Sequence, residues 1–148
     1  MKMFIASDHA GVEVKKEVVD YLNSNGIEVE ELDIPNHETD DYPDFAFALG
    51  KQVVDNNALG ILICGNGIGM SIAANKVKGI RAAVVHDMFT AEMCKRHNNA
   101  NILSMGGRVV SPELAKEMTK KWLETEFEGG RHTNRLNKVS AIEEKYFK

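Results

Sequence analysis

The chain has 148 residues, of which 43% are hydrophobic and 27% are charged, as expected for one compact globular domain spanning residues 1–148. The net charge of −4 argues against a general nucleic-acid or anionic-membrane binder, and no apolar run approaches the roughly 20 residues of a membrane span. Asp8 interrupts any signal-peptide pattern, and two cysteines are too few for a disulfide framework, so we expect a cytoplasmic protein.

Predicted strands and helices alternate along the whole chain. Strands are expected at 2–6, 27–32, 59–63, 80–85 and 101–104, and helices at 11–24, 41–55, from the loop after 64 to 76, 87–96, 111–122 and 135–146. Asp41 and Ser111 are candidate helix caps, each followed within two residues by a proline. This alternation implies right-handed crossovers, and therefore a three-layer α/β/α Rossmann-like fold with a five-stranded parallel sheet and a C-terminal helix.

The most informative stretch is a glycine-rich loop. An apolar run at 60–63 ends in Cys64, and glycines follow at 65, 67 and 69 before a helix-forming run. This order predicts a thiol at the carboxyl end of a strand, where open α/β sheets hold their ligands. A helix N-terminus favours a thiolate, and loop N–H groups can stabilise an oxyanion. Cys64 is therefore a candidate nucleophile or base, whereas Cys94, within a predicted helix, is expected to be structural.

Two familiar kinds of glycine loop do not match this one. A dinucleotide fingerprint requires a third glycine where this chain has Met70, although Asp87 lies about where a ribose-binding acid is expected. A cysteine phosphatase loop requires an arginine soon after the thiol, where this chain has Met70 and Ser71. A non-catalytic nucleotide-binding module therefore stays only as a remote alternative.

Other polar residues complete the candidate site. A parallel sheet would gather the strand ends that carry Ser7, Asp8, His9, His86, Asp87 and residues 104–108 at the same edge as Cys64. His97, in a polar cluster at 97–101, can move a proton at neutral pH. Arg131 and Arg135 would share one helix face and suit a phosphate, because guanidinium groups bind it in a bidentate fashion. The five histidines lack paired ligand spacing, so no metal site is expected.

These landmarks together resemble those of the B-type ribose-5-phosphate isomerases, a family that also contains allose-6-phosphate and galactose-6-phosphate isomerases. The resemblance covers nearly the whole chain. It rests on residues 7–11, 41–44, 64–69, 71–76, 79–82, 97–98, 107–108, 129–132 and 135, in their shared order and spacing.

The resemblance implies that the protein interconverts ribose 5-phosphate and ribulose 5-phosphate through an enediolate, without a metal or cofactor. Cys64 would be the base, and His97 would open the sugar ring with Asn98 alongside. The enediolate oxygen would be held by the amides of Gly65, Asn66, Gly67, Ile68 and Gly69. The rest of the substrate would be held by Asp8 at a hydroxyl, by Tyr42 lining the pocket, and by His9, Arg108, Arg131 and Arg135 at the phosphate.

The same resemblance implies at least a homodimer with shared active sites, in which His97, Asn98 and Arg108 act in the neighbouring site. Whether dimers pair into tetramers is left open, and so is a six-carbon sugar phosphate as substrate.

Two departures from the family pattern bear on the chemistry. Asn66 stands where the family usually has threonine, and a carboxamide cannot relay a proton as a hydroxyl can. Met70 stands near the position where one branch of the family has a glutamate base, so this chain belongs with the cysteine chemistry.

Overall fold

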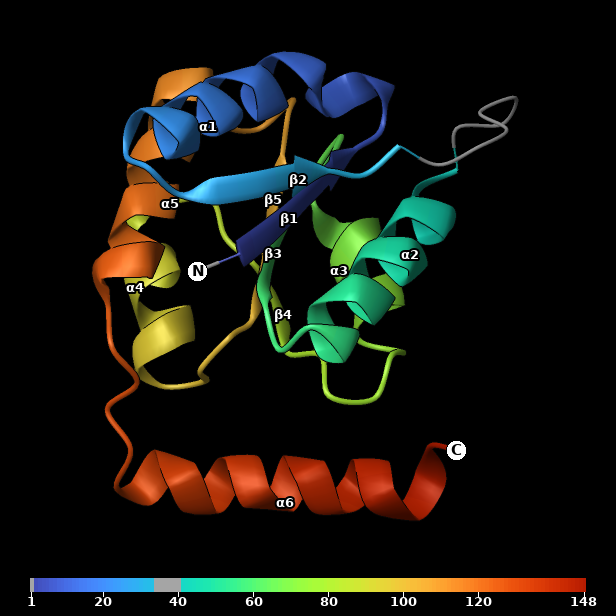
Figure 1. The fold of residues 1–148 in the computed structure, drawn as a ribbon. Coiled ribbons are helices and arrows are strands. Elements are labelled where there is room, and N and C mark those ends of the chain that lie inside the picture. Colours follow the sequence, from blue (N-terminus) through green and yellow to red (C-terminus); the bar gives the residue numbers. More distant parts are fainter. Residues whose placement is uncertain (1, 34–40) are drawn as a thin grey trace.

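The computed structural model describes residues 2–33 and 41–148, in which strands and helices alternate (Figure 1). The strands are β1 (Lys2–Ser7), β2 (Glu28–Glu31), β3 (Leu59–Cys64), β4 (Ala82–Val84) and β5 (Ile102–Gly106). The helices are a 3-10 turn η1 (His9–Gly11), then α1 (Val12–Ser24), α2 (Tyr42–Asp55), α3 (Ile68–Ala74), α4 (Met88–Arg96), α5 (Pro112–Glu124) and α6 (Arg131–Tyr146).

The strands form one parallel sheet in the order β2-β1-β3-β5-β4, which confirms the predicted five-stranded parallel architecture. Strand β3 is central, with its neighbours β1 and β5 in register so that Ile63 lies opposite Ser7 and Cys64 opposite Gly106. We call the edge at which all the strands end the carboxyl edge, and the edge at which they begin the amino edge.

Helices cover both faces of the sheet because alternate strand residues are apolar on each side. On one face, β1 and β3 side chains such as Ile5 and Ile61 pack against α1, α4 and α5. On the other face, Phe4 and Leu62 pack against α2 and α3. Figure 1 shows these three layers, which confirm the predicted α/β/α arrangement. The Trp122 indole N–H donates to the Ala100 carbonyl at 3.2 Å and ties α5 to the segment that leads into β5.

Helix α6 differs from the other helices because it crosses the amino edge as a separate rod (Figure 1). Its contacts there include Glu143, which accepts a hydrogen bond from the Gly79 N–H, and Glu144, 2.8 Å from the Lys78 ammonium. His132 is its one buried residue. The apolar side chains of Val139, Ile142 and Tyr146 are 45%, 58% and 70% exposed, so α6 leaves an apolar surface in solvent.

Most predicted element boundaries agree with the structure to within a few residues. The largest difference is at α6, which begins at Arg131 and not at Arg135. Helix α3 ends at Ala74 and not at residue 76. Ser111 caps α5 by accepting from the Leu114 N–H, as predicted, but Asp41 makes no side-chain cap to α2. No helix within the described ranges is long and apolar enough to cross a membrane.

Candidate active site

Cys64 ends the central strand and lies at the base of the glycine loop, which covers residues 65–69. Its side chain is buried between α2 and α3, with only 5% of the residue exposed. The Gly67 N–H donates to its sulfur at 3.2 Å. Sulfur is a weak hydrogen-bond acceptor, and a backbone donor in this position would suit a thiolate. The sulfur thus contacts the loop N–H on one side and the apolar cluster of α2 and α3 on the other.

The loop is held in place by the neighbouring strand β5. Gly67 has φ 82°, and a Cβ there would lie 2.9 Å from the Met105 carbonyl carbon, so only glycine fits. The buried Ser104 hydroxyl donates to the Gly67 carbonyl at 2.7 Å. The Gly107 N–H donates to the Cys64 carbonyl at 2.7 Å. These bonds fix the thiol and the loop as one rigid unit before any ligand arrives.

Two of the amides predicted to form the oxyanion site already have partners. The Gly67 N–H donates to Cys64, and the Ile68 N–H donates to the Asn66 carboxamide oxygen at 2.9 Å. Within the described residues, the N–H groups of Gly65, Asn66 and Gly69 make no hydrogen bond. Of the five amides expected from the sequence, three are therefore available as donors in this conformation. The Gly67 N–H is used by the Cys64 sulfur, and the Ile68 N–H is used by the Asn66 side chain.

Tyr42, Asp8 and His9 surround the loop from other elements. A Cβ on Gly69 would lie 2.5 Å from the Tyr42 ring, so this ring packs directly on the loop backbone. Asp8 follows β1 and caps η1, because its carboxylate accepts from the Ala10 N–H at 2.9 Å. All three residues thus lie at the carboxyl edge with Cys64, as predicted.

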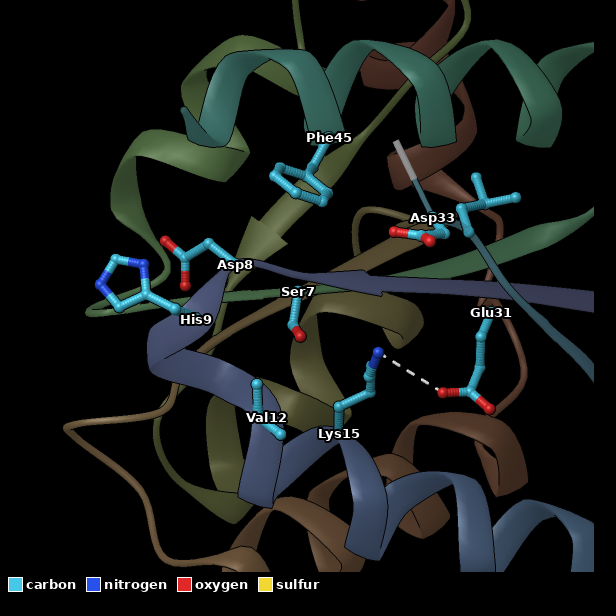
Figure 2. Close-up of a pocket in the computed structure, with 9 residues that line it drawn as sticks. Ser7, Asp8, His9, Val12, Lys15, Glu31, Asp33 and Phe45 are labelled. Atoms are coloured by element: carbon cyan, nitrogen blue, oxygen red, sulfur yellow. Dashed lines mark ion pairs between the residues drawn. The ribbon is translucent and has the colours of Figure 1, made fainter. Parts of the chain in front are cut away.

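A cavity of about 670 Å³ lies beside this group, at the ends of β1 and β2. Figure 2 shows Asp8 and His9 at one end of it, and the Lys15–Glu31 ion pair, 3.4 Å long, at the other. Cys64 does not line this cavity.

Arg108 lies against the glycine loop of its own chain. Its guanidinium Nη1 is 3.4 Å from the position that a Cβ on Gly65 would occupy, and its N–H donates to the Gly65 carbonyl at 3.0 Å. The resemblance grouped Arg108 with His97 and Asn98 in a neighbouring site. That grouping is wrong for this chain's geometry, because the turn after β5 returns Arg108 to the loop that follows β3.

A second polar group lies at the amino edge, and we call it the histidine pair group: His97, Glu128, Arg131 and His132. The His97 and His132 rings stack with centroids 4.3 Å apart and planes 14° from parallel. The Glu128 carboxylate lies 3.8 Å from His97 Nε2 and 3.9 Å from Arg131 Nη1. The Glu128 N–H also donates to the Arg96 carbonyl at 2.9 Å, which ties the segment before α6 to the end of α4.

The surroundings of His132 disfavour the charged form of its imidazole. Burial lowers its pKa from the ordinary value of 6.5, and the charges of Arg131 and His97 lower it further. Its Nε2 is buried and has no hydrogen-bond partner within the described residues. His97, Glu128 and His132 each offer a donor atom, and these atoms all lie within 4.8 Å of one another, as ligands of a metal ion do. The sequence did not predict this cluster because its members lack regular spacing. Of the five histidines, His37 lies outside the described residues.

The two groups lie at opposite edges of the same sheet. The Gly60 N–H at the start of β3 donates to the Asn101 carbonyl, so residues 97–101 lie at the amino edge. Cys64 is four residues further along β3, and a strand rises about 3.3 Å per residue, so about 13 Å of strand intervenes. Within one chain, His97 and Asn98 therefore do not meet Cys64, and neither does Arg131.

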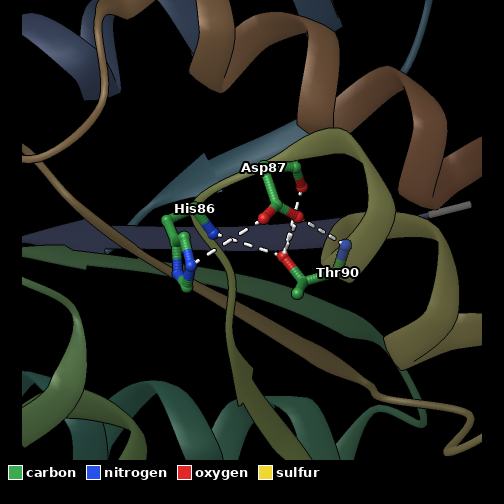
Figure 3. A network of polar contacts seen from close by, with 3 residues as sticks. All are labelled: His86, Asp87 and Thr90. Carbon is green, nitrogen blue, oxygen red and sulfur yellow. Dashed lines mark hydrogen bonds and ion pairs between the residues drawn. The ribbon is translucent and has the colours of Figure 1, made fainter.

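His86 and Asp87 lie at the carboxyl edge as predicted, but on the outermost strand. Figure 3 shows that Asp87 caps α4: its carboxylate accepts from the Thr90 N–H at 2.7 Å and from the Thr90 hydroxyl at 2.8 Å. These hydrogen bonds lower the pKa of Asp87. The cap uses one oxygen of this carboxylate, so Asp87 has a structural role at the start of α4.

Cys94 is the structural cysteine that the sequence predicts. It lies in α4 within the apolar core, and its thiol donates to the Ala91 carbonyl at 3.4 Å. Burial raises the pKa of Cys94 to about 11, which keeps it protonated at neutral pH. Both cysteines are unpaired.

Comparison with known proteins identifies the class. The family model described as Ribose/Galactose Isomerase matches residues 3–139, so the chain belongs to the ribose/galactose isomerase family and the resemblance is confirmed. A putative sugar phosphate isomerase, YwlF, of Bacillus subtilis is 50% identical and covers 98% of this chain and 99% of its own. A D-erythrulose-4-phosphate isomerase of Pectobacterium atrosepticum is 41% identical, with 97% and 95% covered.

Among solved structures, the ribose-5-phosphate isomerase B of Mycoplasma genitalium with bound ribulose-5-phosphate superposes with a TM-score of 0.92. It shares 41% sequence identity, and each chain is covered to 97%. Agreement over the full length confirms the fold, and it makes the protein an enzyme of the aldose–ketose isomerase class.

Ser104, Glu128 and His132 make contacts that the sequence did not predict, although Ser104 was expected at the same edge as Cys64. Ser104 had one usable signal, since it is a polar residue inside the apolar strand segment 102–105. Glu128 lies in an irregular segment between α5 and α6, where no periodicity indicates its direction. His132 belonged to a recognised motif, but its stacking on His97 depends on the path of α6 across the sheet.

Proposed function

We propose that the protein interconverts D-ribose 5-phosphate and D-ribulose 5-phosphate through an enediolate, with Cys64 as the base. One observation carries the proposal: the Cys64 sulfur accepts the Gly67 N–H at 3.2 Å, beside the amides of Gly65, Asn66 and Gly69, which have no partner among residues 2–33 and 41–148. A base and a set of fixed donors in one loop are what proton transfer next to a carbonyl requires.

The chemistry moves one proton between two carbons. The Cys64 thiolate takes the proton from C2 of the open-chain aldose, and the freed electron pair forms a C1–C2 double bond as charge develops on the carbonyl oxygen. The loop amides stabilise that oxygen because they are aimed before charge appears. Return of the proton to C1, with transfer of the O2 proton to O1, gives the ketose.

We assign ring opening and phosphate binding to a second copy of the chain. His97 moves the proton between ring oxygen and anomeric hydroxyl, with Asn98 beside it, and Arg131 and Arg135 hold the phosphate. Three facts support the assignment: these residues lie at the opposite edge from Cys64, α6 exposes an apolar surface, and Arg131 is 64% exposed. In a dimer, the amino edge of one copy meets the carboxyl edge of the other, where Asp8, His9, Tyr42 and Arg108 complete the pocket. The unpaired cysteines fit a reducing cytoplasm.

The length of the sugar is the open part of the proposal. Six-carbon allose and galactose 6-phosphates stay alternatives, and the relative named D-erythrulose-4-phosphate isomerase adds a four-carbon one. The four-carbon sugar differs chemically, because its O4 is esterified and it cannot close a five-membered ring. It therefore needs no ring opening by His97.

The test is kcat/KM on the four-, five- and six-carbon phosphates for wild type and His97→Gln. We expect ribose 5-phosphate to be the best substrate, and the variant to lose at least about a hundredfold on it. Absence of turnover on ribose 5-phosphate at millimolar concentration would end the proposal. If the four-carbon substrate is preferred and His97→Gln leaves its rate intact, the chain belongs with the erythrulose phosphate enzymes.

A further inference from the structure

The histidine pair group has the make-up of a transition-metal site. Two imidazoles and one carboxylate offer donor atoms within 4.8 Å of one another, from His97, His132 and Glu128. Two histidines and a glutamate form one of the donor sets that zinc uses when it keeps a fourth position open. The side chains of His97 and Glu128 are 35% and 42% exposed, so an ion can enter from solvent.

A second, independent observation points to a ligand at the same place. His132 is 95% buried (5% exposed), and its Nε2 has no hydrogen-bond partner within the described part of the chain. Buried polar atoms are nearly always paired, so an orphaned imidazole nitrogen next to two further donors indicates that something else binds there.

We propose that His97, Glu128 and His132 form a zinc-binding site that inhibits the enzyme. The ion would bind the imidazole of His97, so that this side chain could no longer move a proton at the sugar ring. The inhibition rests on the ring-opening role given to His97 above, whereas the binding does not. The site would be regulatory, because the isomerisation proposed above uses Cys64 and His97 and no metal.

The geometry sets what binding must change. Zinc–nitrogen and zinc–oxygen bonds of about 2.0–2.2 Å in a tetrahedron place donor atoms about 3.3 Å apart. The rings, now 14° from parallel, must tilt toward a common point, so binding separates the stack. Arg131, 3.9 Å from the Glu128 carboxylate, competes with the ion for that group and opposes it electrostatically. We therefore expect reversible binding, weaker than at a structural zinc site.

The test is calorimetric titration of the metal-free, full-length protein with zinc chloride, followed by Co²⁺ substitution and visible spectroscopy. We expect one ion per chain, d–d bands typical of a tetrahedral site, and affinity at least about tenfold weaker in Glu128→Gln and His132→Gln. His86→Gln is the matched control, because His86 also lies 3.8 Å from a carboxylate, that of Asp87, but outside the cluster. It should bind zinc as wild type does.

Inhibition gives the second measurement. Zinc should lower the rate on ribose 5-phosphate, a chelator should restore it, and Glu128→Gln should be less sensitive. The site would be overturned if zinc binding were not saturable, or if Glu128→Gln and His132→Gln both bound zinc with the affinity of wild type. If His132→Gln raised KM for the sugar phosphate and left zinc affinity unchanged, the zinc site would be refuted, and His132 Nε2 would instead be assigned to binding the substrate phosphate. An inactive protein that still binds one zinc through these residues would refute the proposed function and keep the site.

Discussion

The two edges of the sheet are built in different ways. At the carboxyl edge, Cys64 and Gly67 are buried, and hydrogen bonds from β5 and the turn after it fix the loop, with Ser104 as the side-chain anchor. At the amino edge, His97, Arg131 and Glu128 are partly exposed and held by stacking and long ion pairs. Fixed geometry suits the atoms that stabilise developing charge, and exposed cations suit capture of a phosphate. In the dimer proposed above, these two edges would be complementary halves of one site, and they cannot meet within a single chain.

The largest expected effect comes from removing the base at the carboxyl edge. Cys64→Ala should lower kcat by about 10³-fold, because a positioned general base contributes on this scale. The matched control is Cys94→Ala, which removes the other buried thiol and should lose stability while keeping kcat close to wild type. Steady-state assays with circular dichroism measure both, and more than a tenth of wild-type kcat in Cys64→Ala would remove this residue from the base role.

Whether the two edges act together in one site is tested by combining a subunit that is defective at the carboxyl edge with one that is defective at the amino edge. Cys64→Ala and His97→Gln subunits are each expected to be inactive alone. Refolded together, half of the dimers carry both variants, and each of these has one intact site, so activity should return to about a quarter of wild type. Recovery measured against the separately refolded proteins checks this. No recovery, with mixed dimers verified by mass, would mean that the edges do not share a site.

A smaller effect is expected from the cations at the amino edge. Arg131→Ala should raise KM for ribose 5-phosphate about tenfold with little change in kcat, since a charge-assisted hydrogen bond is worth about 1.5–3 kcal/mol. Lys138→Ala removes another exposed cation of α6 and should leave KM unchanged. An unaltered KM in the arginine variant would exclude Arg131 from phosphate binding.

The loop anchor should show how far rigidity at the carboxyl edge matters. Ser104→Ala removes the shorter of the two hydrogen bonds to the Gly67 carbonyl and leaves only the one from the Ser71 N–H at 3.3 Å. We expect a loss of about 1–2 kcal/mol in the free energy of unfolding together with a lower kcat. Thr119→Ala is the control, because Thr119 is equally buried and its hydroxyl donates to the Ala115 carbonyl within α5. Urea titration and kinetics should show a stability loss alone for Thr119→Ala; unchanged kcat in Ser104→Ala would remove the anchor from catalysis.

The smallest expected effect concerns the buried thiol of α4. Burial raises the pKa of Cys94 from 9.0 to about 11, so between these values the unfolded chain releases a proton that the folded chain keeps. The unfolded state then binds fewer protons, and the free energy of unfolding falls as pH rises from 9 to 11. Denaturation at several pH values should show a steeper decline for wild type than for Cys94→Ala, and equal slopes would contradict the assignment.

Much of the fold followed from the sequence because alternation of apolar runs is a local signal. The position of Cys64 at a strand end, with Asp8 at the same edge, followed from the rule that parallel strands end at one edge, whereas Tyr42 was expected there only from the family resemblance. The position of His97 at the other edge was also implicit, since α4 must run back to the start of β5. The strand order was not predictable, because no local pattern encodes which strands pair.

The contacts that the sequence did not predict depend on side-chain direction within irregular segments. Asn66 bonds its own loop and removes the Ile68 amide from the donor set, and Arg108 turns back to Gly65. Neither spacing nor residue type fixes such choices, because several rotamers satisfy the same local pattern and tertiary contacts select one.

The single tryptophan gives the molecule its own optical reporter. Trp122 is fully buried, with its indole N–H on the Ala100 carbonyl and the Lys95 ammonium 5.4 Å from its ring centroid. Ala100 follows the turn that carries His97 and Asn98. Any ligand that shifts this turn changes the polarity and hydrogen bonding around one fluorophore, so occupancy near His97 can be followed by intrinsic emission in unlabelled protein.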